Sequence, residues 1–271
     1  MKMAKLLGAI AGDTIGSIYE FNPTKDYSFC LLDERMEITD DSIMTIAVAD
    51  WTIQDTSYSL TNLARIMRQH GQNHLYPMGG YGGRFMQWLQ REELPAYNSW
   101  GNGSAMRVSA CGFACQTLEE TLEVAKRSAE VTHNHPEGIK GAQATAAAIF
   151  LARKGKSKEE IREYITTTFG YDLSKTCDDI RPTYRFDESC QGTVPQSIIA
   201  FLDSKDYEDA IRLAVSLGGD ADTMGAITGA IAIAYYKEMP DEIYGFVKAR
   251  IPKDLWKIVV KFEALHLDVF L

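Results

Sequence analysis

Residues 218–231 read Gly218-Gly219-Asp220-Ala221-Asp222-Thr223-Met224-Gly225-Ala226-Ile227-Thr228-Gly229-Ala230-Ile231, an acidic turn followed directly by an apolar helical run. Residues 39–48 repeat this arrangement as Thr39-Asp40-Asp41-Ser42-Ile43-Met44-Thr45-Ile46-Ala47-Val48. Each stretch places two carboxylates and a threonine hydroxyl in the first turn of a helix that we expect to be buried. N-capping explains either cluster taken alone, because Asp and Thr accept hydrogen bonds from the unpaired amides of a first turn.

The two acidic turns taken together point to a metal site. One cap needs one acceptor, and ionised carboxylates beside a core are costly unless something compensates them. If the turns face each other, Glu20 adds a seventh oxygen ligand to the six from Thr39, Asp40, Asp41, Asp220, Asp222 and Thr223. An all-oxygen set favours Mg²⁺ or Mn²⁺ over zinc. Two such ions about 3.5–4 Å apart could polarise a substrate oxygen or activate water.

The hydrophobic periodicity is helical along nearly the whole chain, which predicts an all-α protein. Capping boxes are expected at Thr117 with Glu120 and at Ser157 with Glu160. The longest irregular stretch, residues 171–192, is expected to be functional or mobile. No linker or composition shift divides the chain, so we expect one domain over residues 1–271. Helices are expected to begin near Met3, Asp40, Leu60, Gly103, Thr117, Pro136, Ser157, Val194, Tyr207, Asp220, Asp241 and Lys253.

The N-terminal run MKMAKLLGAIAG is similar to a signal peptide, but Asp13 interrupts it and the apolar periodicity continues beyond. We therefore expect a first helix rather than a leader. Gly8, Gly12 and Gly16 form a small-residue stripe on this helix, which predicts close packing against its neighbours. No window offers the roughly 18 uncharged apolar residues that a membrane span needs.

The composition bounds the partners and the compartment. Among 271 residues, 28 Lys and Arg stand against 37 Asp and Glu, for a formal net charge of −9. This acidity argues against a protein that coats nucleic acid, since a basic surface supplies most of that affinity. The five cysteines are an odd number and contain no CxxC pair, which favours a reducing, cytoplasmic location.

Two glycine-rich stretches precede predicted helices. They are Met78-Gly79-Gly80-Tyr81-Gly82-Gly83-Arg84 and Ser99-Trp100-Gly101-Asn102-Gly103-Ser104. Neither is a Walker A or a Rossmann motif, because the spacing fails, Lys is missing and no strand precedes them. Backbone amides of such turns can hold phosphates, although each stretch alone is more often just a turn. Beside a dimetal site, the two suggest a ligand that carries a diphosphate.

Residues 132–137, Thr132-His133-Asn134-His135-Pro136-Glu137, lie between two predicted helices. Two histidines one residue apart can ligate a metal, but a helix C-terminus also attracts His for electrostatic reasons. Because the acidic clusters already form an oxygen site, we favour a substrate-contacting or structural role for this segment.

Seven motifs in order along nearly the whole chain make it resemble the ADP-ribosylglycohydrolases of the dinitrogenase reductase-activating type. They are Gly8-x3-Gly12-Asp13-x2-Gly16, Glu20-Phe21, Thr39-Asp40-Asp41, Gly80-Tyr81-Gly82-Gly83, Gly101-Asn102-Gly103-Ser104-Ala105-Met106-Arg107, Thr132-His133 and Gly219-Asp220-Ala221-Asp222-Thr223. The resemblance implies a single compact, orthogonal helical domain with a dimetal cleft. In that cleft, the six ligands of the acidic turns would hold two Mg²⁺ or Mn²⁺ ions.

The resemblance also implies site residues and an activity. Glu20 and Asp41 are expected to be catalytic, and the ADP-ribose contacts are expected from Gly82, Gly83, Ser99, Trp100, Gly101, Asn102, Gly103 and His133. The implied reaction is hydrolysis of the glycosidic bond between ADP-ribose and an acceptor. Protein arginine is the expected acceptor, and another acceptor or a small molecule is the alternative. Nucleic acid is expected only as a modified substrate, and the chain is expected to be a monomer. Non-catalytic ADP-ribose binding and metal-dependent phosphohydrolysis are the alternatives.

Overall fold

The computed structural model describes residues 5–93 and 95–266, and these residues form helices joined by loops, without a β-strand. The all-α prediction is therefore confirmed. The helices are α1 (Lys5–Gly16), α2 (Asp40–Gln54), α3 (Leu60–Asn73), α4 (Gly83–Leu89), α5 (Gly103–Met106), α6 (Ser109–Ala114), α7 (Leu118–Glu130), α8 (Pro136–Arg153), α9 (Lys158–Phe169), α10 (Cys177–Ile180), α11 (Cys190–Asp203), α12 (Tyr207–Val215), α13 (Ala221–Tyr236), α14 (Asp241–Lys248) and α15 (Lys253–Leu265).

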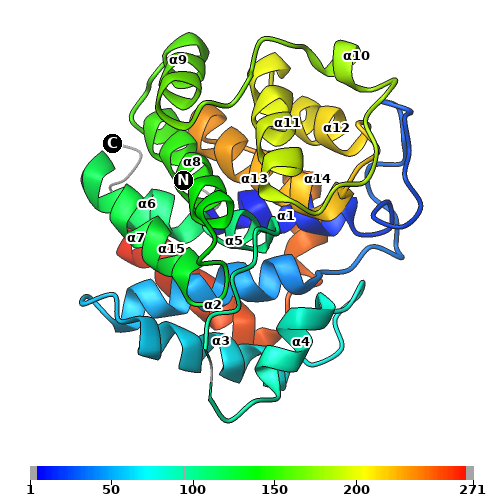
Figure 1. Ribbon diagram of the computed structural model, residues 1–271. Helices are drawn as coiled ribbons and strands as arrows, with labels where there is room; N and C mark the ends of the chain where they lie inside the picture. Colours follow the sequence, from blue (N-terminus) through cyan, green and yellow to red (C-terminus); the bar gives the residue numbers. More distant parts are fainter. Residues whose placement is uncertain (1–4, 94, 267–271) are drawn as a thin grey trace.

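Helices α1 and α13 form the centre of the molecule. All of α1 is buried, and α13 is buried from Ala221 to Ala234. Figure 1 shows α1 crossing the middle of the molecule, with α2, α3 and α15 on one side and α8, α11 and α12 on the other. The buried apolar side chains of these layers join in one continuous cluster. The two most apolar helices are therefore covered on all sides.

Helices α1 and α13 run antiparallel with their backbones in contact. A Cβ atom on Gly12 would lie 1.9 Å from the carbonyl oxygen of Gly225, and one on Gly229 would lie 2.2 Å from that of Gly8. At the end of α1, a Cβ atom on Gly16 would lie 2.3 Å from the carbonyl oxygen of Ala221. These distances confirm the close packing predicted from the glycine stripe. They also bring the C-terminal end of α1 against the acidic N-terminal turn of α13.

Several expected helix boundaries differ from the structure. Helix α11 begins at Cys190 rather than near Val194, because the Ser189 side chain accepts a hydrogen bond from the Gly192 amide and so caps an earlier start. The 171–192 stretch is not wholly irregular, since α10 lies within it and begins with a capping box of Thr176 and Asp179. The expected start near Met3 lies outside the described residues.

The two predicted capping boxes have different outcomes. Ser157 and Glu160 form the full reciprocal pair at the start of α9. At α7 only half of the box is present, because Thr117 accepts from the Glu120 amide while the Glu120 carboxylate accepts from the Gln116 amide. The start of α7 is thus capped as predicted, but its Glu bonds one residue earlier than the box requires.

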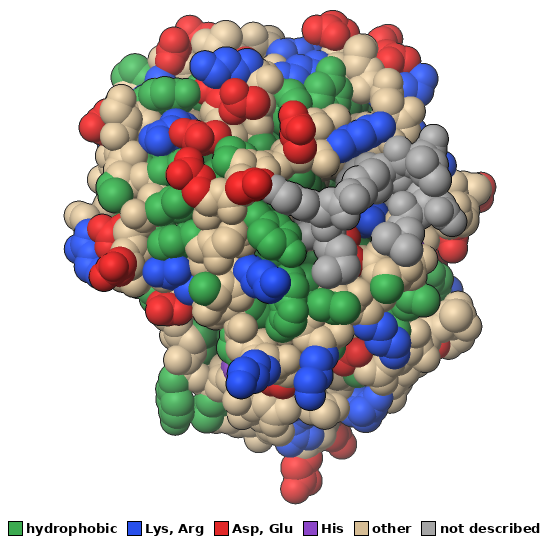
Figure 2. Space-filling view, turned by 180° about the vertical axis from the view of Figure 1, so that it is seen from behind, with side chains coloured by type: hydrophobic (Ala, Val, Ile, Leu, Met, Phe, Trp, Pro, Cys, Tyr) green, Lys and Arg blue, Asp and Glu red, His purple; other side chains and the backbone are tan. Residues whose placement is uncertain are grey.

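The exposed surface carries charges of both signs. On the face shown in Figure 2, Lys and Arg side chains are interspersed with Asp and Glu side chains. No helix in the described part of the chain has the length and apolar composition to cross a bilayer.

The contact between α1 and α13 predicts that Gly12→Ala strongly destabilises the protein. The added methyl group would overlap the α13 backbone, and overpacking against atoms that cannot move away costs about 3 kcal/mol. The free energy of unfolding, measured by urea titration with circular dichroism, should fall by about that amount. Gly245→Ala in α14 is the control, because a Cβ atom there meets nothing within 4 Å. It should leave stability unchanged or raise it by about 0.5–1 kcal/mol, and equal losses in both variants would contradict the proposed role of the contact.

Candidate metal and substrate site

The two acidic turns and both glycine-rich loops line one cleft with a volume of about 300 Å³. The cleft thus brings together residues that are far apart in the sequence. The predicted site residues that line it are Glu20, Asp40, Asp41, Gly82, Gly83, Ser99, Gly101, Asn102, Gly103, His133, Asp220, Asp222 and Thr223. Two other predicted residues, Thr39 and Trp100, lie outside this lining.

Carboxylates in the cleft and next to it form two overlapping groups. Oxygen atoms of Asp13, Asp41 and Asp222 lie within 4.8 Å of one another, and so do oxygen atoms of Glu20, Asp220 and Asp222. Asp222 belongs to both groups. Because one carboxylate can bridge two ions, this overlap is the arrangement expected of a two-cation site.

Asp13 is a member of this cluster that the sequence analysis missed. It is fully buried in α1, and its carboxylate accepts hydrogen bonds from the Thr39 hydroxyl at 2.6 Å and the Thr39 amide at 3.0 Å. It also accepts from the amide of Ser42 at 3.1 Å and from the hydroxyl of Ser42. A side chain of α1 therefore caps the first turn of α2. A lone carboxylate in an otherwise apolar helix was the sequence feature that could have revealed it.

Thr39 lies beneath the acidic cluster with no exposed surface. Its hydroxyl donates to Asp13 and accepts from the amide of Asp41 at 3.2 Å, which makes Thr39 the N-cap of α2. The proton of this hydroxyl is thus directed to Asp13. The structure fixes the capping role, and the role of Thr39 as a metal ligand stays a prediction.

The cluster has the unsatisfied charge that a cation site requires. Among the described residues, no group donates a hydrogen bond to Asp41 Oδ1 or Glu20 Oε2, although both atoms are buried. Burial raises the pKa of these carboxyl groups, and repulsion from neighbouring carboxylates adds to the effect. The pKa of Glu20 is raised to about 8, and the pKa values of Asp40, Asp41 and Asp222 are raised well above the ordinary value. An oxygen-only donor set with surplus negative charge fits hard divalent cations.

Asn102 connects the second glycine-rich loop to the acidic cluster. Its side-chain nitrogen donates to Asp220 Oδ2 at 2.6 Å and to Thr193 Oγ1 at 3.1 Å. Its amide donates to the carbonyl oxygen of Glu188 at 2.7 Å, next to an isolated β-bridge between Gly101 and Ser189. Asn102 was predicted as a substrate contact, and in the structure it orients a carboxylate of the cluster. The 171–192 stretch also reaches the cleft, through Phe186 and Glu188.

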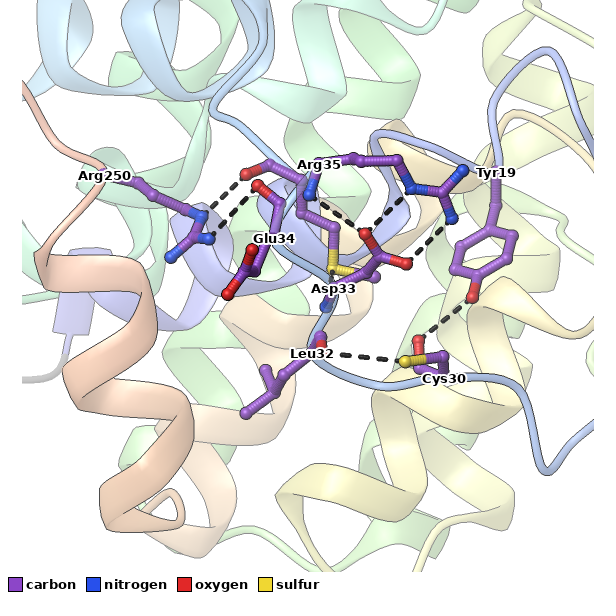
Figure 3. Close-up of polar contacts among 8 residues, drawn as sticks. Tyr19, Cys30, Leu32, Asp33, Glu34, Arg35 and Arg250 are labelled. Atoms are coloured by element: carbon purple, nitrogen blue, oxygen red, sulfur yellow. Dashed lines mark hydrogen bonds and ion pairs between the residues drawn. The ribbon is translucent and has the colours of Figure 1, made fainter.

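Glu20 follows α1 on a segment that is fixed by polar contacts. The Tyr19 hydroxyl donates to the carbonyl oxygen of Cys30 at 3.0 Å, and Arg250 Nε donates to that of Met36 at 2.7 Å (Figure 3). On the other side of Glu20, the first glycine-rich loop passes so close that a Cβ atom on Gly79 would lie 2.7 Å from Glu20 Oε2. Gly79 also has a φ of +75°, so this position favours glycine on two grounds.

Aromatic side chains lie at the edge of the site. The Trp100 ring is 47% exposed and packs edge-on against His135 at 5.6 Å between centroids. Phe186, which the sequence analysis did not single out, stacks with the exposed Phe21 at 6.4 Å. The cleft wall also contains Arg84, a cation that follows the Gly82-Gly83 pair.

Comparison with known proteins points to the family that the sequence motifs resemble. ADP-ribosylhydrolase ARH3 of Homo sapiens is 26% identical over an alignment of 308 residues, gaps included. The alignment covers 85% of this chain and 84% of that protein. ADP-ribosylarginine hydrolase Tri1 of Pseudomonas putida is 27% identical over 270 residues, covering 88% of this chain and 71% of that protein. A solved structure described as an ADP-ribosylglycohydrolase-related protein complex superposes with a TM-score of 0.71 at 23% identity, over 99% of this chain and 96% of that one, and so shares the fold.

The family model named ADP-ribosylglycohydrolase matches residues 3–264, which is nearly the whole chain. The names of the relatives indicate ADP-ribosylhydrolase enzymes. The chain therefore belongs to the ADP-ribosylglycohydrolase family.

Proposed function

We propose that this protein hydrolyses the N-glycosidic bond between ADP-ribose and the guanidinium group of a protein arginine. The observation that carries the proposal is the arrangement of the carboxylates in two clusters of three that share Asp222. Glu20 belongs to one of these clusters and lines the same cleft as both glycine-rich loops. Membership of the family supports the reaction class. The arginine acceptor is supported by the relative from Pseudomonas putida, which is named an ADP-ribosylarginine hydrolase.

Two Mg²⁺ or Mn²⁺ ions are the proposed cofactors, held by Thr39, Asp40, Asp41, Asp220, Asp222 and Thr223. The ions would supply positive charge for ribose hydroxyl groups and lower the pKa of a water molecule. The buried, unpartnered oxygen of Asp41 supports this proposal, because an uncompensated carboxylate beside a core is costly.

Glu20 and Asp41 are the proposed catalytic residues. In the reaction, water forms a bond to C1″ of the distal ribose, the bond from C1″ to nitrogen breaks, and the leaving guanidine takes up a proton. Glu20 Oε2 is buried without a hydrogen-bond donor among the described residues, and burial favours the protonated carboxyl group, so Glu20 is the proposed acid that passes a proton to the leaving nitrogen. Water gives up one proton as it bonds to C1″, and Asp41, within the same cluster, would accept it, which balances the proton that Glu20 gives to the leaving nitrogen.

The remaining lining residues are proposed to hold ADP-ribose. Backbone amides at Gly82, Gly83 and Gly103 suit phosphate oxygens, and Arg84 adds a positive charge to the same wall. Gly101 lines the wall too, but its amide donates to Ser99 Oγ at 3.1 Å. Ser99 and His133 offer side-chain hydrogen bonds, and Trp100 could contact the ligand only from outside this lining. Residues 1–271 are proposed to form one domain, because the described core is one cluster. The monomeric state stays a prediction. The cytoplasmic location stays a prediction.

Incubation of arginine-ADP-ribosylated protein with the enzyme and Mg²⁺ or Mn²⁺ should release free ADP-ribose, detected by mass spectrometry. Glu20→Gln should lower kcat by roughly 10²–10⁴-fold, because the proton transfer is lost. The same assay with serine-linked and nucleic-acid-linked ADP-ribose tests the acceptor. Release of AMP or phosphate would instead indicate a phosphohydrolase. Binding of ADP-ribose without release from any substrate would indicate a non-catalytic protein.

Asp222→Asn should weaken divalent-cation binding more than any other single change in the cluster, since Asp222 belongs to both carboxylate groups. We expect the dissociation constant for Mn²⁺, measured by calorimetry or electron paramagnetic resonance, to rise by about 100-fold or more. Glu242→Gln removes one exposed carboxylate in α14 and is the matched control. If both variants bind Mn²⁺ as the wild type does, the cations are not held at this cluster.

Without divalent cations, the protein should lose stability as the pH rises. Burial raises the pKa of Asp13 and Asp220 to about 6 and that of Glu20 to about 8, against about 4 in the unfolded chain. The folded state therefore binds protons that the unfolded chain releases between about pH 4 and pH 8, so acid stabilises the cation-free fold. Melting curves with Mg²⁺ and with a chelator should differ in Tm far more at about pH 8 than at about pH 5. An equal difference at both pH values would contradict this account.

A further inference from the structure

Arg107 is a buried cation in the cleft wall, and no carboxylate pairs with it in the described part of the chain. It is 1% exposed, and its Nε atom has no hydrogen-bond partner. One terminal nitrogen donates to the carbonyl oxygen of Ser128 at 3.1 Å and to Thr132 Oγ1 at 2.8 Å. A guanidinium group can only donate hydrogen bonds, so the direction of the bond to Thr132 is fixed.

The bond from Arg107 limits how the Thr132 hydroxyl can bond to the neighbouring His133. A hydroxyl has one proton to donate and two lone pairs to accept with, and Arg107 occupies one lone pair. The second partner of this hydroxyl is His133 Nδ1 at 2.7 Å, to which Thr132 can donate its one proton.

We propose that Arg107 and Thr132 are positioning residues that hold neutral His133 with its proton on Nε2, as a hydrogen-bond donor to an oxygen atom of the bound ligand. The geometry places Nε2 at the second glycine-rich loop. A Cβ atom would lie 3.6 Å from Nε2 if added to Gly101 and 3.2 Å if added to Gly103. His133 lines the cleft, and no described residue accepts a hydrogen bond from its Nε2.

The neutral state of His133 has a clear physical cause. Burial first, then the charge of Arg107, holds the pKa of His133 well below its usual range. A neutral ring has one donor and one acceptor nitrogen, and here Thr132 occupies the acceptor. The ring edge in the cleft can therefore only donate, which selects a phosphate or ribose oxygen as its partner. The identity of that ligand as ADP-ribose rests on the proposed function, whereas the tautomer does not.

Long-range ¹H–¹⁵N correlation spectra of the ligand-free protein with ¹⁵N-labelled histidine test the tautomer directly. His133→Gln identifies the resonances of His133 among the five histidines of the chain. We expect a protonated Nε2 and an unprotonated Nδ1 at neutral pH. A proton on Nδ1, or a doubly protonated ring, would overturn the inference without recourse to any assay of activity.

Two variants of Thr132 separate the hydrogen bond from the shape of the side chain. Thr132→Val keeps the branched side chain but removes the hydroxyl, so the Nδ1 resonance should shift and the affinity for ADP-ribose, measured by calorimetry, should fall about 10-fold. Thr132→Ser keeps the hydroxyl and should retain both the Nδ1 resonance and the affinity. Arg107→Met should move the Nδ1 resonance in the same direction as Thr132→Val. An unchanged Nδ1 resonance in Thr132→Val would overturn the proposed hydrogen bond from Thr132 to Nδ1.

A smaller ligand can show which part of ADP-ribose contains the oxygen that accepts the hydrogen bond from His133 Nε2. ADP lacks the distal ribose, so an equal loss of ADP and ADP-ribose affinity in Thr132→Val assigns the contact to the phosphates or the adenosine. A loss for ADP-ribose alone assigns it to the distal ribose. If wild-type protein binds no ADP-ribose with either cation, the proposed function is wrong, and the ligand-free spectra still decide the tautomer.

Discussion

The close contact between α1 and α13 is the constraint on which the rest of the structure depends. Carbonyl oxygens of Gly8 and Gly225 occupy the space where side chains of Gly229 and Gly12 would otherwise be. Because the helices are antiparallel, this contact sets the C-terminal end of α1 against the N-terminal turn of α13. Asp13 and Glu20 from one chain segment thereby meet Asp220 and Asp222 from another that is some two hundred residues away in the sequence.

The same constraint explains why the acidic cluster can be buried. Asp13 projects from α1 into the first turn of α2, where it accepts hydrogen bonds from Thr39 and Ser42. These bonds offset part of the cost of burying its own charge, and the other carboxylates have fewer such partners. Asp41 Oδ1 and Glu20 Oε2 have none among the described residues. The backbone contact therefore concentrates carboxyl groups that hydrogen bonds alone do not compensate, and this supports the proposed cation site.

Much of this arrangement could be predicted from the sequence, because its local patterns are strong. The glycine stripe predicted close packing, and the paired acidic turns predicted that Asp40, Asp41, Asp220 and Asp222 would meet in one place. Interactions between distant segments could not be predicted in the same way. Asp13 was interpreted as an interruption of an apolar run and as part of a family motif, without a place in the acidic cluster, and the hydrogen bond from Asn102 to Asp220 was not predicted. Both omissions have one physical origin, since a hydrogen bond across elements leaves no periodicity in the sequence.

The cleft combines charges of opposite sign, and this combination narrows the range of suitable ligands. Its acidic cluster offers carboxylate oxygens that suit cations, while the same wall contains Arg84 and the buried Arg107, which no described carboxylate neutralises. Burial lowers the pKa of Arg107 to about 10, so it is still charged at neutral pH. A ligand with only hydroxyl groups would leave the arginines uncompensated, and a ligand with only phosphates would be repelled by the carboxylates unless cations were bound. A molecule that offers ribose hydroxyls to the cation side and a diphosphate to the arginines satisfies both requirements, and ADP-ribose has this composition.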